Sequence, residues 1–233
     1  MWLHAPNIKS VHGFSTRHGG VSPAPFNSLN LGGSDDTENN ISQNRHLALQ
    51  QLQLKFSNLA FLKQVHGNDV VIARCGKQEG DALVSNEKGK ILAVSIADCY
   101  PLLFEDSKNG VIGAAHAGWR GTLSKIAANT IAAMQKLGAQ TSEIKVAIGQ
   151  GISAKRFEVG AEVQQRFREE GFPEHCFENN TIDLIACNKH VILQQGIAPK
   201  NIWSMNRCTY ESDFFSYRRD AGLTGRMWAI IAL

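Results

Sequence analysis

Two apolar runs at the centre of this chain, each ending in polar groups, decide its fold. The first is ILAVSIADCYP over residues 91–101, and the second is VIGAAHAGWRG over residues 111–121. Short apolar runs bounded by turn-forming residues are typical of buried strands. We therefore predict buried strands at 91–96 and 111–115, with Asp98, Cys99 and His116 placed where each strand leaves its sheet.

Strand and helix patterns alternate outward from this centre. After Gly121, apolar residues recur at helical spacing over 123–137, and Gly138 is placed to end that helix. We also expect strands at 61–65, 145–148 and 227–233, a helix near 42–54 capped by Asn39 or Asn40, and a helix that begins at Asp183 and closes at Gly196. This alternation has no clean break, so it predicts one α/β domain over residues 1–233.

Composition excludes several classes of protein. A chain of 233 residues, 43% of them hydrophobic, can bury a sizeable core without disulfides. Its 24 basic and 21 acidic residues are mixed, which argues against nucleic-acid polymers or an anionic membrane as partners. No apolar stretch reaches the roughly 18 residues that span a bilayer, and no secretion signal opens the chain. Five cysteines, an odd number without a CxxC pair, favour a reducing cytoplasm.

Three residues that can bind metals follow three of the predicted strands. His66 follows 61–65, Cys99 follows 91–96 and His116 follows 111–115. If these strands are neighbours, two imidazoles and a thiolate converge and leave a fourth position open for water or substrate. The long spacing is weak evidence, because an ordinary turn histidine and a small buried cysteine fit it equally. A cysteine nucleophile beside a histidine also fits, and spacing does not separate it from a metal ligand.

Other polar groups near these strand ends suit catalysis or anion binding. Asp98 is a candidate general base or a partner of a ligand imidazole, and an Asp that closes a turn is the alternative. Arg120 stands at the start of a helix, where backbone N–H groups favour anions, and Arg17 lies in a glycine-rich loop. Three more arginines occupy similar settings near the end of the chain: Arg218, Arg219 and Arg226.

Six short motifs occur together and in order along the chain. They are FSTRHGGVS (14–22), QVHG (64–67), GDA (80–82), ADCYP (97–101), HAGWRG (116–121) and FSYRRD (215–220). Together they resemble the YfiH or laccase-domain family, long labelled multicopper polyphenol oxidases and later described as purine nucleoside phosphorylases. The resemblance runs from about Gly13 to Arg226. One departure is the segment 149–159, which lacks the Pro and the Cys pair that the family often has there.

The resemblance implies a fold, a metal and an activity. The fold is a layered α/β/β/α sandwich, and the metal is zinc, held by His66, Cys99 and His116. The activity is phosphorolysis of adenosine, inosine and methylthioadenosine, with adenosine deamination. The expected partners are a purine nucleoside and phosphate, and the expected state is a monomer, with an oligomer left open.

Roles for individual residues follow from that activity. We expect substrate contacts from Arg17, Asn30, Asp81 and Arg120, with the two arginines at phosphate or ribose. Asp81 or Asp98 would supply a proton or hydrogen bond to the purine. Catalysis is assigned to Asp98, Cys99 and His116. Zinc lowers the pKa of a bound water toward about 7, which suits attack on purine C6.

The residues weigh against a four-copper oxidase, although they leave other activities open. Such an oxidase needs many histidines in HxH pairs, and none of the eight histidines forms one. Copper binds these ligand types more tightly than zinc, so a copper-dependent polyphenol oxidase activity stays an alternative. Two further alternatives are a Cys-dependent amidase or hydrolase that edits peptidoglycan precursors and a metal-binding regulator without catalysis.

Overall fold

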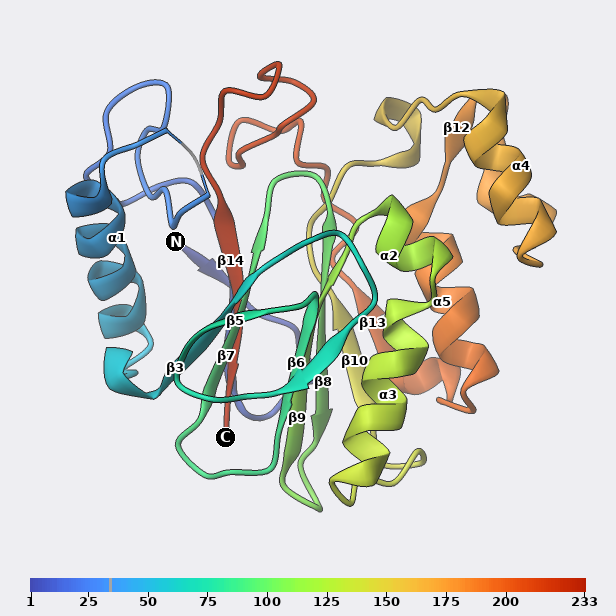
Figure 1. The fold of residues 1–233 in the computed structure, drawn as a ribbon, viewed down its shortest axis with the longest axis horizontal. Helices are drawn as coiled ribbons and strands as arrows, with labels where there is room; N and C mark the ends of the chain where they lie inside the picture. Colours follow the sequence, from blue (N-terminus) through green and yellow to red (C-terminus); the bar gives the residue numbers. More distant parts are fainter. Residues whose placement is uncertain (34) are drawn as a thin grey trace.

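The computed structural model describes residues 1–33 and 35–233. Two six-stranded sheets stack against each other, and helices cover both outer faces (Figure 1). Helix α1 (Glu38–Gln51) lies outside one sheet, and α2 (Trp119–Leu123), α3 (Ile126–Lys136) and α5 (Leu184–Gln194) lie outside the other. Helix α4 (Ala161–Glu169) stands at the far side of that second helical layer.

The first sheet joins distant parts of the chain. Its strand order is β1 (Trp2–Leu3), β2 (Val11–Ser15), β14 (Met227–Ala232), β7 (Ile91–Ile96), β3 (Leu59–Lys63) and β5 (Gly76–Glu79). Strand β14 pairs antiparallel with both β2 and β7, whereas β3 runs parallel to β7 and β5. The end of the chain therefore lies in the middle of this sheet.

The second sheet is built mainly from the centre of the chain. Its order is β13 (Ile202–Ser204), β10 (Lys145–Ile148), β8 (Tyr100–Asp106), β9 (Val111–Ala117), β6 (Ala82–Ser85) and β4 (Val70–Ile72). Strands β8 and β9 form an antiparallel pair seven residues long. A small separate ribbon joins β11 (Phe177–Glu178) and β12 (Thr181–Ile182), and short 3-10 turns occur at Phe56–Asn58, Ala154–Arg156, Glu174–Cys176 and Pro199–Asn201.

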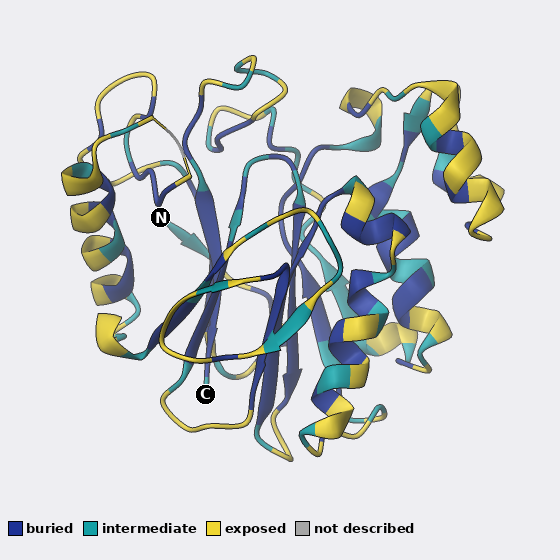
Figure 2. Cartoon of the chain, in the orientation of Figure 1, coloured by how far each residue is buried: buried dark blue, intermediate teal, exposed yellow. Residues whose placement is uncertain are grey.

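Three apolar layers hold these elements together. Leu49 of α1 packs with Trp228 of the first sheet, and Leu92 packs with Leu103 between the two sheets. Ile131 of α3 belongs to the third layer, which covers the outer face of the second sheet. Figure 2 shows both sheets largely buried and the outward faces of α1 and α4 exposed. This arrangement confirms the predicted α/β/β/α sandwich.

The strand predictions were mostly accurate. Strands at 91–96 and 145–148 are confirmed with those bounds, the 227–233 strand ends one residue earlier, and the 61–65 strand occupies Leu59–Lys63. The strand predicted at 111–115 continues to Ala117, so His116 lies inside β9 and not after it. Strands β1, β2, β4, β5, β6, β8 and β13 of the two sheets were not predicted. At β8, Asp98 before Pro101 suggested a turn.

The helix predictions were right in place but wrong in detail. Asp183 caps α5 by accepting a hydrogen bond from the N–H of Ala186, as expected. Helix α1 begins earlier than predicted, and its cap is Thr37, whose side chain accepts from the N–H of Asn40. The helix predicted over 123–137 is divided into α2 and α3, because Lys125 adopts a left-handed backbone conformation between them. No helix among the described residues is long and apolar enough to cross a bilayer.

A substitution at Gly149 tests the close contact between the two sheets. A methyl group there would overlap the Phe14 ring of the first sheet and lie 2.7 Å from Pro101 Cγ of the second. Overpacking of this kind costs about 1–3 kcal/mol. We expect Gly149→Ala to lower the free energy of unfolding by that amount in urea titrations. Gly171→Asn is the control, because its site is open and Asn tolerates a left-handed conformation; an equal loss in both variants would contradict this packing.

Candidate functional site

The chain crosses from the first sheet to the second between β7 and β8. Asp98 and Cys99 lie at this crossing, and Asp98 has a left-handed φ of 88°. His66, which follows β3, has a φ of 60°. Because β3 runs parallel to β7, His66 and Cys99 leave the first sheet at the same end. Strained backbone of this type is found at functional sites, where surrounding contacts hold it in place.

The antiparallel pair β8 and β9 brings the third group to the same place. Pro101 pairs with His116 in this register, so Cys99 lies beside the end of β9. The sequence left open whether the three strands are neighbours. Strands β3 and β7 are neighbours in the first sheet, whereas β9 belongs to the second. Convergence results from the stacking of the sheets as well as from strand pairing.

Two imidazoles and a thiol meet at this junction. One ligand atom from each of His66, Cys99 and His116 lies within 4.8 Å of the others. The two imidazole rings meet edge to face, with 4.8 Å between their centroids. This is the one cluster of three metal-capable groups among residues 1–33 and 35–233. The donor set and its geometry fit a metal with three protein ligands and an open position.

Asp81 lies behind these ligands and orients them. Its carboxylate is fully buried and accepts a hydrogen bond from His116 Nδ1 at 2.9 Å. The same carboxylate accepts from the backbone N–H of His66 at 3.0 Å and of Gly67 at 2.7 Å. With its Nδ1 proton directed at Asp81, His116 presents Nε2 to the other ligands.

These contacts also fix the charge on Asp81. Burial by itself raises the pKa of its carboxyl, but the hydrogen bonds from His116 and Gly67 outweigh burial and lower the pKa below its usual value. Asp81 is therefore a carboxylate at neutral pH. Its predicted contact with substrate stays a prediction, since Asp81 is not among the described residues that line the cavity in front of the ligands.

Cys99 and His116 form a charged pair when no metal neutralises them. Burial raises the pKa of the Cys99 thiol, yet the nearby His116 and His66 lower it to about 6. Burial conversely lowers the pKa of His116, while Cys99 and Asp81 raise it to about 9. Between these values a thiolate faces an imidazolium. A thiolate is the form of cysteine that binds metals and attacks electrophiles.

Glycine is required in the HAGWRG motif because the ligands come so close to the backbone. A methyl group on Gly118 would lie 2.9 Å from Cys99 Sγ and 3.4 Å from His66 Cδ2. A methyl group on Gly121 would lie 2.9 Å from the carbonyl oxygen of Gly67. The two glycines thus permit the start of α2 to pack directly against the candidate metal site.

A cavity of about 1060 Å³ opens in front of the three ligands. Gln64, which follows β3, and Ser95 of β7 line this cavity. The side-chain amide of Gln64 replaces a strand partner for Ser95: Gln64 Nε2 donates to the Ser95 carbonyl, and the Ser95 N–H donates to Gln64 Oε1. Phe157, Tyr217 and Arg218 line it from loops. This volume is at the upper end of the range usual for small-molecule sites.

Five residues were assigned to substrate or catalysis without a role as metal ligands: Arg17, Asn30, Asp81, Asp98 and Arg120. Among them, and within the part of the chain that the structure describes, only Asp98 lines the cavity. Its Oδ1 accepts from Thr209 Oγ1 at 2.6 Å, and its Oδ2 accepts from the backbone N–H of Arg218 at 2.7 Å. The carboxylate thereby ties the crossing between the sheets to the loop before β14.

Arg17, Asn30 and Arg120 do not line this cavity. Arg17 donates from Nε to the carbonyl oxygen of Asn27 and lies over the Phe215 ring. Arg120 is exposed and covers the Trp119 ring. Asn30 is fully buried, and its Nδ2 donates to Asp36 Oδ2 at 3.0 Å. Substrate contact by these three residues stays a prediction that this geometry does not support.

Among the arginines that line the cavity, sequence reasoning missed Arg45 altogether and underrated Arg218 and Arg226. Arg45 of α1 lines the cavity but stands in no motif, so the sequence offered no signal for it. Arg218 and Arg226 also line the cavity, and both lie in or beside the FSYRRD motif region. Arg219 points the other way and donates to the carbonyl oxygens of residues 209, 210, 211 and 214, which holds the loop together.

Comparison with known proteins identifies the family. The family model described as multi-copper polyphenol oxidoreductase laccase matches residues 11–233. The chain belongs to this laccase-domain, or YfiH, family. It is 44% identical, over 99% of its length and 92% of the relative, to a protein of Deinococcus radiodurans named purine nucleoside phosphorylase. It is 34% identical, over 94% of its length and 92% of the relative, to Escherichia coli purine nucleoside phosphorylase YfiH.

Solved structures of the family agree with the fold. The crystal structure of YlmD from Geobacillus stearothermophilus superimposes with a TM-score of 0.92 at 33% identity, covering 99% of this chain and 95% of that one. A Neisseria meningitidis family member gives a TM-score of 0.89 at 35% identity, covering 100% and 98% of the two chains. The recognition made from the six motifs is thereby confirmed.

Asp81→Asn tests the orienting role of the buried carboxylate. We expect a loss of roughly 10–100-fold in metal affinity, with added Zn²⁺ as the probe, because the candidate ligand histidine loses its charged hydrogen-bond partner. Competition with a chromogenic chelator measures this affinity. Asp69→Asn removes an exposed carboxylate from the same segment and is the matched control. Unchanged affinity in Asp81→Asn would show that the carboxylate does not orient the site.

The charged pair predicts an unusual pH dependence for the metal-free protein. Alkylation of Cys99 by iodoacetamide, followed by mass spectrometry of its peptide, should rise through pH about 6, because the thiolate is lost only below that pH. His116→Gln should move the midpoint upward. A midpoint near the ordinary cysteine pKa of about 8.5 in the unsubstituted protein would contradict the pair.

Proposed function

We propose that this protein is a metal-dependent purine nucleoside phosphorylase. It splits adenosine, inosine and methylthioadenosine with phosphate into the free base and the (methylthio)ribose 1-phosphate, and it also deaminates adenosine. One observation supports this above the others: His66, Cys99 and His116 converge beside a cavity of about 1060 Å³. The names of the curated relatives supply the reaction class.

Zinc is the metal that we propose for this site. Two imidazoles and a thiolate are preferred zinc ligands, and Asp81 provides the outer carboxylate usual for such histidines. When bound, zinc supplies a Lewis acid that activates water or polarises a substrate oxygen. The other steps are assigned to groups of the chain itself.

Phosphorolysis exchanges one bond at the anomeric carbon of ribose. A phosphate oxygen bonds to C1′ while the C1′–N9 bond breaks and its electron pair moves to the purine. Positive charge builds on the sugar in this process, and the leaving purine requires a proton or hydrogen bond. We assign Asp98 to the sugar or purine, because its carboxylate lines the cavity and two hydrogen bonds hold it in place. Phe157 and Tyr217 line the same cavity and supply aromatic surface to the nucleoside.

A cysteine hydrolase is the second candidate. The lowered pKa of Cys99 and its histidine partner are the features that a nucleophilic cysteine needs. A multicopper reaction finds less support, since the described residues provide one three-ligand cluster. A single bound copper ion is compatible with that cluster, so polyphenol oxidation remains a side activity to measure.

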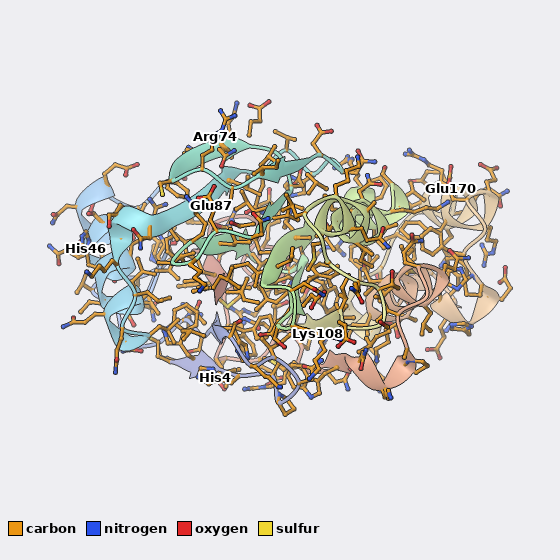
Figure 3. All side chains as sticks on the ribbon, turned by 90° about the horizontal axis from the view of Figure 1, so that it is seen from below. His4, His46, Arg74, Glu87, Lys108 and Glu170 are labelled. Atoms are coloured by element: carbon orange, nitrogen blue, oxygen red, sulfur yellow. The ribbon has the colours of Figure 1, made fainter. Side chains whose placement is uncertain are left out.

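The direct test of function uses the zinc-loaded protein with adenosine and phosphate. We expect chromatography to show adenine and ribose 1-phosphate formed in equal amounts, with inosine as the product of deamination. Omission of phosphate should abolish adenine formation. His66→Gln should lower the rate at least about 100-fold through loss of a metal ligand, whereas His46→Gln should not, because His46 is exposed on α1 (Figure 3). No adenine from the zinc-loaded protein would refute the proposal.

Cys99→Asp separates a metal ligand from a nucleophile. Aspartate can bind zinc but does not replace a thiolate in attack. If Cys99 only binds the metal, the variant retains zinc and part of its phosphorylase activity. Complete loss of activity with zinc still bound, measured by metal analysis, would favour the cysteine hydrolase.

A further inference from the structure

Two half-buried arginines face the cavity without an ion pair. Arg45 comes from α1 and Arg226 from the residue before β14, and both line the cavity that holds the metal ligands. Within residues 1–33 and 35–233, neither guanidinium forms a salt bridge. Burial lowers the pKa of both below the usual arginine value, although both remain cations at neutral pH. Glu38 acts electrostatically on Arg45, and Cys99, Tyr217 and Asp98 act on Arg226, without an ion pair to either guanidinium from the described residues, so each guanidinium can still accept an anion in direct contact.

Both guanidinium groups keep donors available. Arg45 donates from Nε to the Leu31 carbonyl at 2.9 Å, and no described residue accepts from either Nη. Arg226 donates from Nη1 to the carbonyls of Thr224 and Gly225 at 3.0 Å, and its Nε and Nη2 have no acceptor among the described residues. Some N–H groups of each guanidinium therefore hold it in place on backbone carbonyls, and the remaining N–H groups are available to a ligand.

Aromatic packing fixes Arg45 in this position. Its guanidinium lies 5.1 Å from the centroid of Phe61 and 5.2 Å from the Trp228 ring. Trp228 belongs to β14 and stands two residues after Arg226, which precedes that strand. The ring that supports Arg45 is thus close in the chain to Arg226.

A pair of glycines lies against the two arginines. A methyl group on Gly32 would lie 2.5 Å from Arg45 Nη2, and one on Gly33 would lie 3.2 Å from Arg226 Cγ. Both glycines have positive φ, at 134° and 68°. Two consecutive glycines therefore lie against one arginine each, and a side chain at Gly32 would displace the Arg45 guanidinium.

Asn30 connects the two sides of this arrangement. Its Oδ1 accepts from the Gly32 N–H at 3.2 Å and from the Arg226 N–H at 2.9 Å. The amide holds the glycine pair against the segment that carries Arg226. Asn30 itself does not line the cavity, so its predicted contact with substrate stays a prediction.

The cavity as a whole favours an anion. Its charged residues are Arg45, Lys63, Lys77, Arg218 and Arg226 against Asp35, Glu38 and Asp98. Lys63 is paired with Glu79 at 2.8 Å, and Asp98 accepts hydrogen bonds from Thr209 and the Arg218 N–H, while Lys77, Arg218, Asp35 and Glu38 are exposed. Arg45 and Arg226 are therefore the half-buried cations of this cavity. The excess of positive charge attracts a multivalent anion, and guanidiniums bind phosphate through paired hydrogen bonds.

We propose that Arg45 and Arg226, beside Gly32 and Gly33, bind the inorganic phosphate used by this protein. The inference rests on the proposed phosphorylase function and names its anion site. It replaces Arg17 and Arg120, which lie outside the cavity. The phosphate then shares the cavity with the metal ligands and Asp98, as transfer to a nucleoside requires.

The test is titration of the zinc-loaded protein with inorganic phosphate, without nucleoside, in a calorimeter. We expect Arg45→Gln and Arg226→Gln each to raise the Kd for phosphate at least about 10-fold, the size expected for one charge-assisted hydrogen bond. Arg226→Lys should give a smaller loss, because it keeps the charge without the planar fork. Arg74→Gln is the charge-matched control on the periphery of the molecule (Figure 3).

Several results would overturn the assignment. Unchanged phosphate affinity in a folded Arg226→Gln protein is one, and loss in Arg120→Gln instead is another. Arg45 holds α1 against the loop at Leu31, so Arg45→Gln can fail to fold. In that case the phosphate affinities of Arg226→Gln and Arg226→Lys test the assignment. A second titration with adenosine 5′-monophosphate tests whether the site binds inorganic phosphate or a nucleotide phosphate. If the variants raise the Kd only for the nucleotide, the site does not bind inorganic phosphate.

The phosphate site and the proposed function fail in different ways. Phosphate binding that depends on both arginines, without any adenine production, would leave the site intact and refute the phosphorylase. Adenine production with an unchanged KM for phosphate in both Gln variants would confirm the phosphorylase and refute the site. We expect the unsubstituted protein to convert adenosine and phosphate into adenine. In the Gln variants we expect the KM for phosphate to rise and the KM for adenosine to change little.

Discussion

A fully buried carboxylate holds the candidate site together. Asp81 accepts the Nδ1 proton of His116 and the backbone N–H groups of His66 and Gly67. A buried charge is tolerated only when hydrogen bonds replace its lost hydration, so these donors cannot move apart without a large cost. One side chain between β5 and β6 thereby sets the orientation of ligands from both sheets.

The stacked sheets supply the second constraint. Chain crossing at Asp98 and Cys99 joins the end of β7 to the start of β8, and close packing around Gly149 keeps the two sheets in contact. The cavity then forms where loops, α1 and the residues before β14 meet above this crossing. Its metal-binding end and its basic walls are parts of one space, which is why we place both reactants of a phosphorolysis in it.

Much of the fold was predictable because local patterns were strong. The apolar run at Ile91–Ile96 and the cap at Asp183 act over a few residues, and both were placed correctly. Strand β8 was missed because Asp98 and Pro101 are turn-forming residues in isolation. The three metal-capable residues were identified from their strand ends and motifs, but Arg45 was not, since a single arginine in a helix carries no local signal.

The sequence alone determined the alternation of strands and helices and the family, because apolar periodicity and short motifs are properties of neighbouring residues. The layered sandwich and the assignment of the three candidate ligands to a metal came with the resemblance to that family. Only the tertiary structure decided which arginines face the cavity and that Asp81 stands behind the ligands. Arg17 and Arg120 matched the expected chemistry yet point to Asn27, Phe215 and Trp119. The direction of a side chain depends on contacts between segments far apart in the chain, and no local pattern encodes those contacts.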